Sequence, residues 1–510
     1  MTTQHANSGS QAAYDELIRR SREQQLLSSC SALLSWDEHT YMPKGGAEHR
    51  GNQLALLAGI HHDRATDPKL GELIAEVEGS PTAAEAGSAP AANVRELRRA
   101  YDRYTKLPRR LVEEMARATS KGNEDWVAAR KEKSFRILRP TLETIVRLKR
   151  QEAECLGYED DPYDALIDEY EPGAKSRDLA ALFDAVRVEL VPLLAAIKGS
   201  TRRPDRSILK REYPVERQRF FGEAVASAVG FDFERGRLDT TEHPFCTGIG
   251  TGDTRITTRF DVHNFNDAFF GILHEVGHGL YDQGLDPVHQ GTPMGEAVSL
   301  GIHESQSRLW ENIVGRGKAF WTYWFPLAKQ VFREPLHGVG LDAFHFAINE
   351  VEPSLVRVQA DEITYNLHIL IRFELERALL NDDLPLEDLP AAWTEKYVHY
   401  LGVTPRNDLE GCLQDIHWSA GLFGYFPTYT LGNIYAAQFY AKAAEELGDL
   451  SAAFGRSDFS GLLDWLRARI HSQGQRYRAD ELARKVTGSP PDHRPLIHSL
   501  RKKYGELYGF

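Results

Sequence analysis

Apolar side chains recur every three or four residues along most of the chain, with charged residues between them. This spacing is typical of amphipathic helices. It is clearest in six segments, 12–27, 95–105, 133–154, 361–380, 432–447 and 459–472. No motif repeats at a fixed period, which argues against a helical solenoid. The pattern therefore predicts a mainly α-helical protein.

Two segments depart from this pattern. Residues 242–265 read EHPFCTGIGTGDTRITTRFDVHNF, where an alternating run follows a Gly-containing turn, and this predicts a short antiparallel hairpin or small sheet. Residues 79–93 read GSPTAAEAGSAPAAN and lack large apolar side chains, which predicts a flexible surface loop between helices. Because the helical pattern is the same on both sides of this loop, we expect one domain over 1–510.

Composition and charge narrow the class of protein. The net charge is −13 over 510 residues, and the short basic runs are broken by acids, so we expect no nucleic-acid partner. No apolar run reaches the roughly 18 residues of a membrane span, and the first residues lack the layout of a signal peptide. Four cysteines stand far apart without a C-x-x-C pair, which favours reduced thiols in a cytoplasmic protein: Cys30, Cys155, Cys246 and Cys412.

A candidate metal site lies directly after the predicted sheet, in FFGILHEVGHGLYDQG. Residues four apart share a helix face, so His274 and His278 can present two imidazole nitrogens to one Zn2+ ion. Glu275 is one step further round, where its carboxylate can accept a proton from metal-bound water. The apolar flanks predict a buried helix, in which these polar side chains would be costly without a partner.

A catalytic zinc ion needs a third protein ligand. The segment 295–315 carries three candidates, Glu296, Glu304 and Glu311, and the small residues around Glu304 favour it because they permit close approach of the first helix. Glu296 is explained by its place near a helix start, and Glu311 by a surface position. His303 is an alternative, although its side chain is rotated about 100° from that of Glu304.

These motifs match one family in order along nearly the whole chain. The sequence resembles the M32 metallocarboxypeptidases, the carboxypeptidase Taq family, with Val356 where that family often has Ile. The resemblance rests on seven segments: SWDEHTYMPKGGAEHR (35–50), HPF (243–245), DTRIT (253–257), HEVGH (274–278), HESQ (303–306), VRVQAD (356–361) and GCLQDIHW (411–418).

The resemblance implies a mainly α fold with a deep groove, a small antiparallel sheet beside the zinc helix, and a homodimer. It also implies His274, His278 and Glu304 as zinc ligands, with Co2+ able to substitute, and Glu275 as general base. The implied reaction removes single residues from peptide C-termini with broad specificity. In it, zinc-bound water attacks the scissile carbonyl while Glu275 takes the proton.

An exopeptidase also has to bind the terminal carboxylate of its peptide substrate, and the planar guanidinium of arginine suits this. Arg357 is the first candidate, followed by Arg406 and Arg255. An ordinary ion pair is the alternative role for each arginine. The remaining candidates are His243 for substrate contact, Tyr425 slightly ahead of Tyr429 as oxyanion donor, and Asp361, Asp415 and His417 as supports for other site residues.

Two other functions remain open from the sequence. A related helical zinc endopeptidase or dipeptidyl carboxypeptidase would share the H-E-x-x-H…E arrangement. A non-catalytic scaffold with a structural zinc ion would lack hydrolytic activity, but such a site is normally closed by a fourth protein ligand. No fourth ligand is evident in the sequence.

Overall fold

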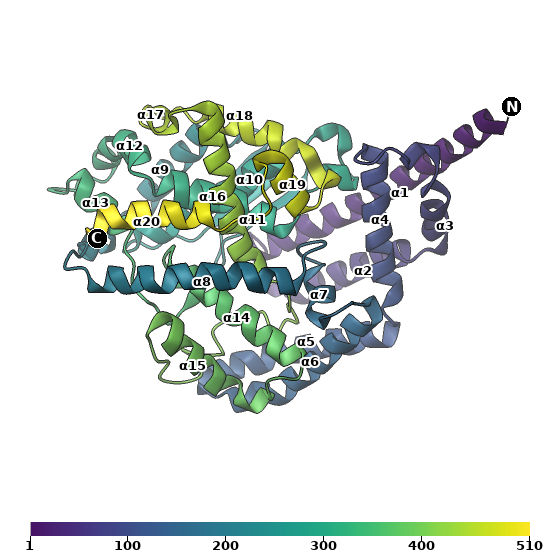
Figure 1. The fold of residues 1–510 in the computed structure, drawn as a ribbon, viewed down its shortest axis with the longest axis horizontal. Coiled ribbons are helices and arrows are strands. Elements are labelled where there is room, and N and C mark those ends of the chain that lie inside the picture. Colours follow the sequence, from purple (N-terminus) through teal and green to yellow (C-terminus); the bar gives the residue numbers. More distant parts are fainter. Residues whose placement is uncertain (1) are drawn as a thin grey trace. The chain divides into compact units, whose positions relative to one another are not determined.

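Twenty α-helices and three short strands are distributed over residues 2–510, the part of the chain that the computed structural model describes (Figure 1). The prediction of a mainly α-helical fold is confirmed. The contacts divide the chain into two compact units. The first unit takes the residues up to 105, 205–348 and 439–490, and the second takes 106–204, 349–438 and 491–510. The single domain expected over 1–510 stays a prediction.

The first unit contains all three strands and most of the helices. Its strands are β1 (Gly236–Thr240), β2 (Cys246–Gly250) and β3 (Asp253–Thr258). Its helices are α1 (Thr2–Thr40), α2 (Ala47–Ala65), α3 (Pro68–Val77), α4 (Ala89–Lys106), α9 (Val215–Val229), α10 (Phe265–Gly284), α11 (Leu300–Arg308), the π-helical η6 (Leu309–Gly315), α12 (Lys318–Val331), α13 (Leu341–Ile348), α17 (Leu450–Phe454), α18 (Ser460–Arg469) and α19 (Ala479–Thr487).

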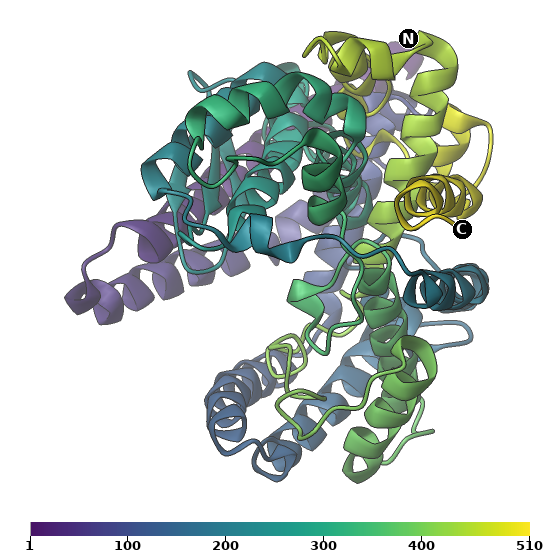
Figure 2. The same ribbon diagram turned by 90° about the vertical axis from the view of Figure 1, so that its left-hand side faces the viewer.

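The described residues of the second unit form helices joined by turns and loops, without a strand. The pair α5 and α6 packs together, and α14 packs against both α6 and α15, as the blue and green helices of Figure 2 show. Helices α8 and α20 lie side by side although they are far apart in sequence (Figure 1). The bounds are α5 (Arg109–Glu132), α6 (Phe135–Leu156), α7 (Pro162–Ile167), α8 (Ser176–Gly199), α14 (Thr364–Leu380), α15 (Leu389–Leu401) and α20 (Arg494–Tyr508), while α16 (Pro427–Leu447) contributes residues to both units.

None of the helices within residues 2–510 combines the length and the apolar character that a membrane span requires.

The small sheet is mixed, which corrects the expected antiparallel sheet. Strands β2 and β3 form the predicted antiparallel hairpin, with Cys246 opposite Ile256 and a bulge between Gly248 and Gly250. Strand β1 pairs with the other edge of β3 in parallel, giving the order β1-β3-β2. The sequence pattern covered only the hairpin, and β1 lies outside the segment it marked. Helix α10 packs directly against β2 and β3.

The loop expected over 79–93 is shorter than predicted. Residues Pro81–Ala83 form a 3-10 turn, and α4 already begins at Ala89. Ala92 and Asn93 are buried. Alanine has the highest helix propensity of all residues, so the Ala-rich end of this segment continues into the helix once it packs.

Helix α10 is buried on nearly all sides and forms the centre of the first unit. Its start is capped by the Asn264 side chain, which accepts a hydrogen bond from the backbone N–H of Asp267. Phe265 and Phe269 at this end stack at 5.2 Å between ring centroids. They anchor the helix in a cluster of aromatic side chains that also includes Phe221, Trp321, Phe332 and Phe344.

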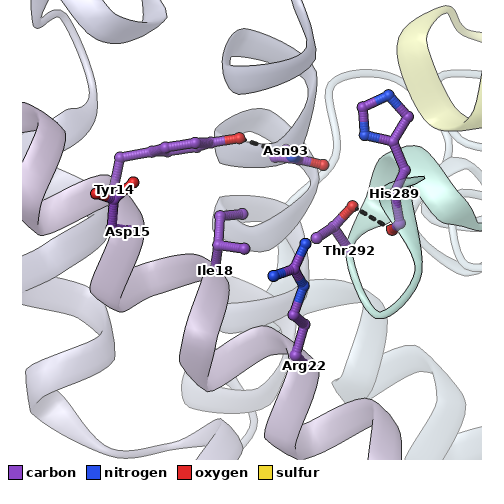
Figure 3. Close-up of a pocket in the computed structure, with 7 residues that line it drawn as sticks. All are labelled: Tyr14, Asp15, Ile18, Arg22, Asn93, His289 and Thr292. Atoms are coloured by element: carbon purple, nitrogen blue, oxygen red, sulfur yellow. Dashed lines mark hydrogen bonds between the residues drawn. The ribbon is translucent and has the colours of Figure 1, made fainter.

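The connection from α10 to α11 is tied to helices from the beginning of the chain. The amide of Asn93, on α4, accepts from the backbone N–H of Met294 at 3.0 Å and donates to the Tyr14 hydroxyl of α1 at 2.9 Å. The Ser21 hydroxyl donates to the carbonyl of Gly291 at 2.8 Å. Figure 3 shows part of this contact, where α1, α4 and the connection border a pocket lined by Ile18 and six polar side chains. These contacts fix the segment that leads into α11.

Gly277 allows α10 and α11 to approach each other closely. A Cβ atom at this position would lie 2.5 Å from the carbonyl oxygen of Gln306 and 2.5 Å from the Cα atom of Ser307. Both atoms belong to the backbone of α11, so neither can move without shifting that helix. Any residue other than glycine at 277 would therefore force the two helices apart.

We expect Gly277→Ala to lower the free energy of unfolding by about 1–3 kcal/mol, because the added methyl group overpacks the helix contact. Gly271→Ala is the matched control on the same helix, since its Cβ would meet only the Thr258 hydroxyl at an ordinary 3.5 Å. This control should be neutral or stabilising by up to about 1 kcal/mol through helix propensity. Urea denaturation of the three proteins measures both effects. Equal stabilities for the two variants would contradict this account of the helix contact.

Candidate metal centre

Two histidines of α10 and one glutamate of α11 meet inside the first unit. The Nε2 atoms of His274 and His278 lie 3.8 and 3.5 Å from Oε2 of Glu304. One ligand atom from each residue falls within 4.8 Å of the others. The two histidines share a face because they are one helical turn apart, and the close approach at Gly277 brings the glutamate to them. Their role as metal ligands stays a prediction.

The geometry of this group suits a divalent cation, and so does the protonation of His278. Ligand bonds of about 2.0–2.2 Å in a tetrahedral arrangement place neighbouring donor atoms about 3.3 Å apart, close to the separations seen here. Burial lowers the pKa of His278 to about 4, so its imidazole is neutral at neutral pH, as a metal ligand must be. Two imidazoles and one carboxylate form a set of three ligands, which is typical of catalytic zinc sites.

Each candidate ligand is held by a neighbouring side chain. His274 Nδ1 contacts Oε2 of Glu311 at 2.9 Å, and His278 Nδ1 contacts Nδ1 of His303 at 2.6 Å. Both contacts use Nδ1 and leave the Nε2 atoms directed at Glu304. Arg308 donates from Nε to Oε1 of Glu304 at 2.7 Å, so the other carboxylate oxygen faces the histidines.

The charges around the group keep Glu304 ionised. Burial alone would raise the pKa of this carboxyl, but Arg308 and the two histidines hold it well below its usual range. The pKa of Glu311 is also lowered despite burial, by Arg308 and His274. A cation placed between the histidines would therefore meet a carboxylate that is already charged.

Glu275 lies beside this group and is 6% exposed. Its pKa is raised to about 7, mainly by burial; His274 opposes this shift, and the nearby carboxylates of Glu304 and Glu311 add to it. A carboxyl group whose pKa lies near neutral pH is suited to exchange protons during a reaction.

Three alternatives considered for the third ligand have other positions. Glu296 is exposed and precedes the start of α11. The Nδ1 atom of His303 contacts the Nδ1 atom of His278. Glu311, expected at the surface, is only 13% exposed at its side chain and contacts His274, so that expectation was wrong. It follows Glu304 by seven residues, which is two turns, so it lies on the same face of the continuous helix α11–η6.

The sequence pattern also missed two supporting residues. Arg308 is four residues beyond Glu304, and Asp282 is four residues beyond His278. Asp282 contacts Nε2 of His303 with Oδ1 at 3.1 Å. Each of these residues lies one helical turn after a candidate ligand, and this spacing could have indicated both of them from the sequence.

Two predicted substrate-binding residues belong to the first unit. His243 is exposed in the connection from β1 to β2. Arg255, on β3, forms two hydrogen bonds to Asp253 at 2.8 Å each, and its guanidinium lies 4.2 Å from the ring centre of Trp36. Their contact with a substrate stays a prediction.

Arg357 belongs to the second unit and is 6% exposed. Its Nε and Nη2 atoms donate to Oδ1 of Asp415 at 2.9 and 2.7 Å, and Nη1 donates to the Tyr365 hydroxyl at 3.1 Å. Arg372 donates to the other oxygen of Asp415 at 2.6 Å. Burial favours the neutral form of Asp415, but the two guanidinium groups hold the pKa of this carboxyl well below its usual range. Asp415 thus fixes the orientation of Arg357.

The other predicted residues of the second unit have varied surroundings. Arg406 is exposed and pairs with Glu410. Tyr425 is half-buried, with its ring 5.4 Å from that of Tyr429 and 5.5 Å from that of His417. Asp361 accepts hydrogen bonds from the backbone N–H groups of Ile363 and Thr364 at 2.9 Å each, which supports the first turn of α14.

Comparison with known proteins agrees with the resemblance. The family model described as "Carboxypeptidase Taq (M32) metallopeptidase" matches residues 16–504. "Thermostable carboxypeptidase 1" of Thermus thermophilus is 52% identical over 508 residues, which cover 98% of this chain and 99% of that protein. "Carboxypeptidase 1" of Bacillus subtilis is 37% identical over 481 residues, which cover 94% and 96% of the two proteins.

Solved structures show the same similarity. The crystal structure of the M32 carboxypeptidase from Deinococcus radiodurans R1 matches with a TM-score of 0.94 at 40% identity, covering 98% of this chain and 100% of that chain. The family match spans both units and includes the three residues of the candidate metal centre. The chain therefore belongs to the carboxypeptidase Taq (M32) family of metallopeptidases and is a peptide-bond hydrolase.

Proposed function

We propose that the protein removes single amino acids from the C-termini of peptides, with broad side-chain tolerance, using zinc held by His274, His278 and Glu304. The observation that carries this proposal is the meeting of two imidazole nitrogens and one carboxylate oxygen within 4.8 Å. The buried Glu275 beside them supports a catalytic site, because a purely structural site has no use for a free carboxyl group.

The donor set supports zinc as the resident ion. Imidazole and carboxylate ligands in a group of three suit Zn2+, and Co2+ is expected to substitute because it accepts the same ligands. When bound, the ion polarises the scissile carbonyl and makes water more acidic. Hydrogen bonds at Nδ1 of both histidines hold their Nε2 atoms toward the position of the ion.

Glu275 is the proposed general base. Its carboxylate takes the proton from the attacking water molecule and then delivers it to the amine of the departing residue. Burial raises the pKa of Glu275 to about 7, while a nearby cation favours the ionised form that accepts a proton. The side chain is therefore suited to both transfers near neutral pH.

Arg357 is the proposed partner of the terminal carboxylate of the peptide. Asp415 and Tyr365 hold its guanidinium in one orientation, which lowers the entropy lost when it binds a carboxylate. Arg255 and Arg406 remain candidates for the same role. His243 is proposed to contact the substrate, and Tyr425 to donate a hydrogen bond to the developing oxyanion.

We also propose a homodimer in the cytoplasm. The free cysteines support a reducing compartment, since Cys30 is exposed and still unpaired with another cysteine. The family resemblance supports the dimer, and light scattering of the purified protein measures it.

The order of products from a defined peptide tests the reaction. We expect a ladder in which each product is one residue shorter at the C-terminus than the one before. Mass spectrometry of samples taken over time measures these products. Internal cleavage would point to an endopeptidase and loss of residue pairs to a dipeptidyl carboxypeptidase. Either outcome would overturn the proposed reaction while leaving the family assignment intact.

Substituting Glu275 by glutamine should separate chemistry from metal binding. Glu275→Gln keeps the size of the side chain but not its basicity, so kcat should fall by about 10²–10⁴-fold. The variant should retain one zinc ion per chain, because Glu275 is not a proposed ligand. Peptidase assays and elemental analysis of the same preparation measure the two effects. Unchanged activity would support a non-catalytic zinc site instead.

The role of Arg357 should appear as a preference for free C-termini. We expect wild-type enzyme to prefer a peptide acid over its C-terminal amide, and Arg357→Met to lose most of that preference through a raised KM for the acid. Arg406→Met is the control at an exposed arginine and should keep the preference. The opposite pattern, with loss only in Arg406→Met, would assign carboxylate binding to Arg406.

A further inference from the structure

His278 is held through two residues in succession. His303, on α11, places Nδ1 2.6 Å from Nδ1 of His278. Its other ring nitrogen, Nε2, lies 3.1 Å from Oδ1 of Asp282, one turn beyond His278 on α10. Two successive contacts therefore link His278 on α10 to His303 on α11, and His303 to Asp282 on α10. His274 differs, because a carboxylate oxygen of Glu311 contacts its Nδ1 directly.

The acceptor at one end of this path and a metal ion at the other end would together set its hydrogen positions. An ionised carboxylate only accepts hydrogen bonds, so Asp282 requires a hydrogen on Nε2 of His303. Nε2 of His278 can bind a metal ion only when the hydrogen of that ring is on Nδ1, so Nδ1 of His303, 2.6 Å away, has to accept that hydrogen. The Nε2 atom of His278 that would bind the ion faces Glu304 Oε2 at 3.5 Å.

We propose that His303 and Asp282 are positioning residues that fix the ring orientation and the tautomer of His278 for metal binding. This inference rests on the proposed function, since it takes His278 Nε2 as a metal ligand. Neither residue belongs to the proposed set of metal ligands. His303 presents a hydrogen-bond acceptor to His278, and Asp282 presents one to His303. Each residue affects metal affinity through this acceptor.

Burial makes these contacts effective. The side chains of His278, His303 and Asp282 are 15%, 20% and 17% exposed, so water competes weakly for their hydrogen bonds. The Tyr281 ring packs against His303 at 5.1 Å between centroids, which limits rotation of the imidazole. The thiol of Cys246 donates a hydrogen bond to the second oxygen of Asp282 at 3.8 Å.

The alternative role for His303 is packing alone. Its ring contacts Tyr281 and also lies 4.6 Å from the ring of His278, so loss of the imidazole would disturb the site in either case. A matched pair of substitutions separates the two roles. His303→Gln keeps an acceptor oxygen on a side chain of similar length, whereas His303→Leu keeps the bulk without any acceptor.

Zinc affinity is the measurement that distinguishes them. We expect competition with a chromogenic chelator to show that His303→Leu weakens zinc binding by about 10–100-fold, while His303→Gln restores most of the affinity. Asp282→Leu should also weaken binding, because His303 loses the acceptor that sets its tautomer. His289→Leu, a substitution outside the site in the same unit, should bind zinc as wild type does.

A spectroscopic readout tests the tautomer itself. In zinc-loaded protein with ¹⁵N-labelled histidine, the wild type should show His278 with a protonated Nδ1 and a metal-bound Nε2. His303→Leu should lose the hydrogen-bonded shift of that Nδ1 proton, and His303→Gln should keep it. Thermal unfolding of all variants in excess chelator reports whether the metal-free fold is intact.

The outcomes separate this inference from the proposed function. Wild-type protein that fails to bind one zinc ion would overturn the proposed metal site. If the wild type binds zinc but His303→Gln and His303→Leu lose affinity equally, packing explains the effect and the inference is wrong. Wild-type affinity in His303→Leu would also overturn it. If that variant does not fold, Asp282→Leu decides, since unchanged zinc affinity there contradicts the inference.

Discussion

The candidate metal centre depends on how closely two helix backbones can approach. His274 and His278 lie on α10, but the third candidate ligand comes from α11, and Gly277 between the two histidines leaves room for the α11 backbone. A side chain at that position would keep Glu304 away from both imidazoles. The glycine in H-E-V-G-H is therefore as necessary to the geometry as the residues that carry the chemistry.

Arg308 lowers the free-energy cost of burying negative charge at the candidate metal centre. Three carboxylates, Glu275, Glu304 and Glu311, lie close together in buried surroundings, which by itself would favour their neutral forms. Arg308 contacts two of them and keeps both ionised. No guanidinium group is among the main causes of the pKa shift of Glu275, and burial raises this pKa to about 7. The same cluster thus contains carboxylates suited to binding a cation and one suited to moving a proton.

Much of the fold and the centre was predictable because it depends on local spacing. The helical pattern, the β2–β3 hairpin and the shared face of His274 and His278 follow from periodicity alone. The parallel pairing of β1 did not, since it joins segments whose register no local pattern records. Glu311 was misplaced because polar neighbours in sequence suggested exposure, whereas the packing of η6 against α10 buries it.

Local spacing in the sequence was enough to predict a helical chain and one helix that carries His274, Glu275 and His278, and the ordered motifs were enough to show the resemblance to one peptidase family. Glu304 was favoured from the sequence over Glu296 and Glu311, but its approach to both histidines is seen only in the folded chain, as are Glu311 behind His274 and the pair of His303 and Asp282 behind His278. Helical periodicity fixes which residues face the same way within one element. The partner that each face meets depends on packing between elements, which is set by the whole chain.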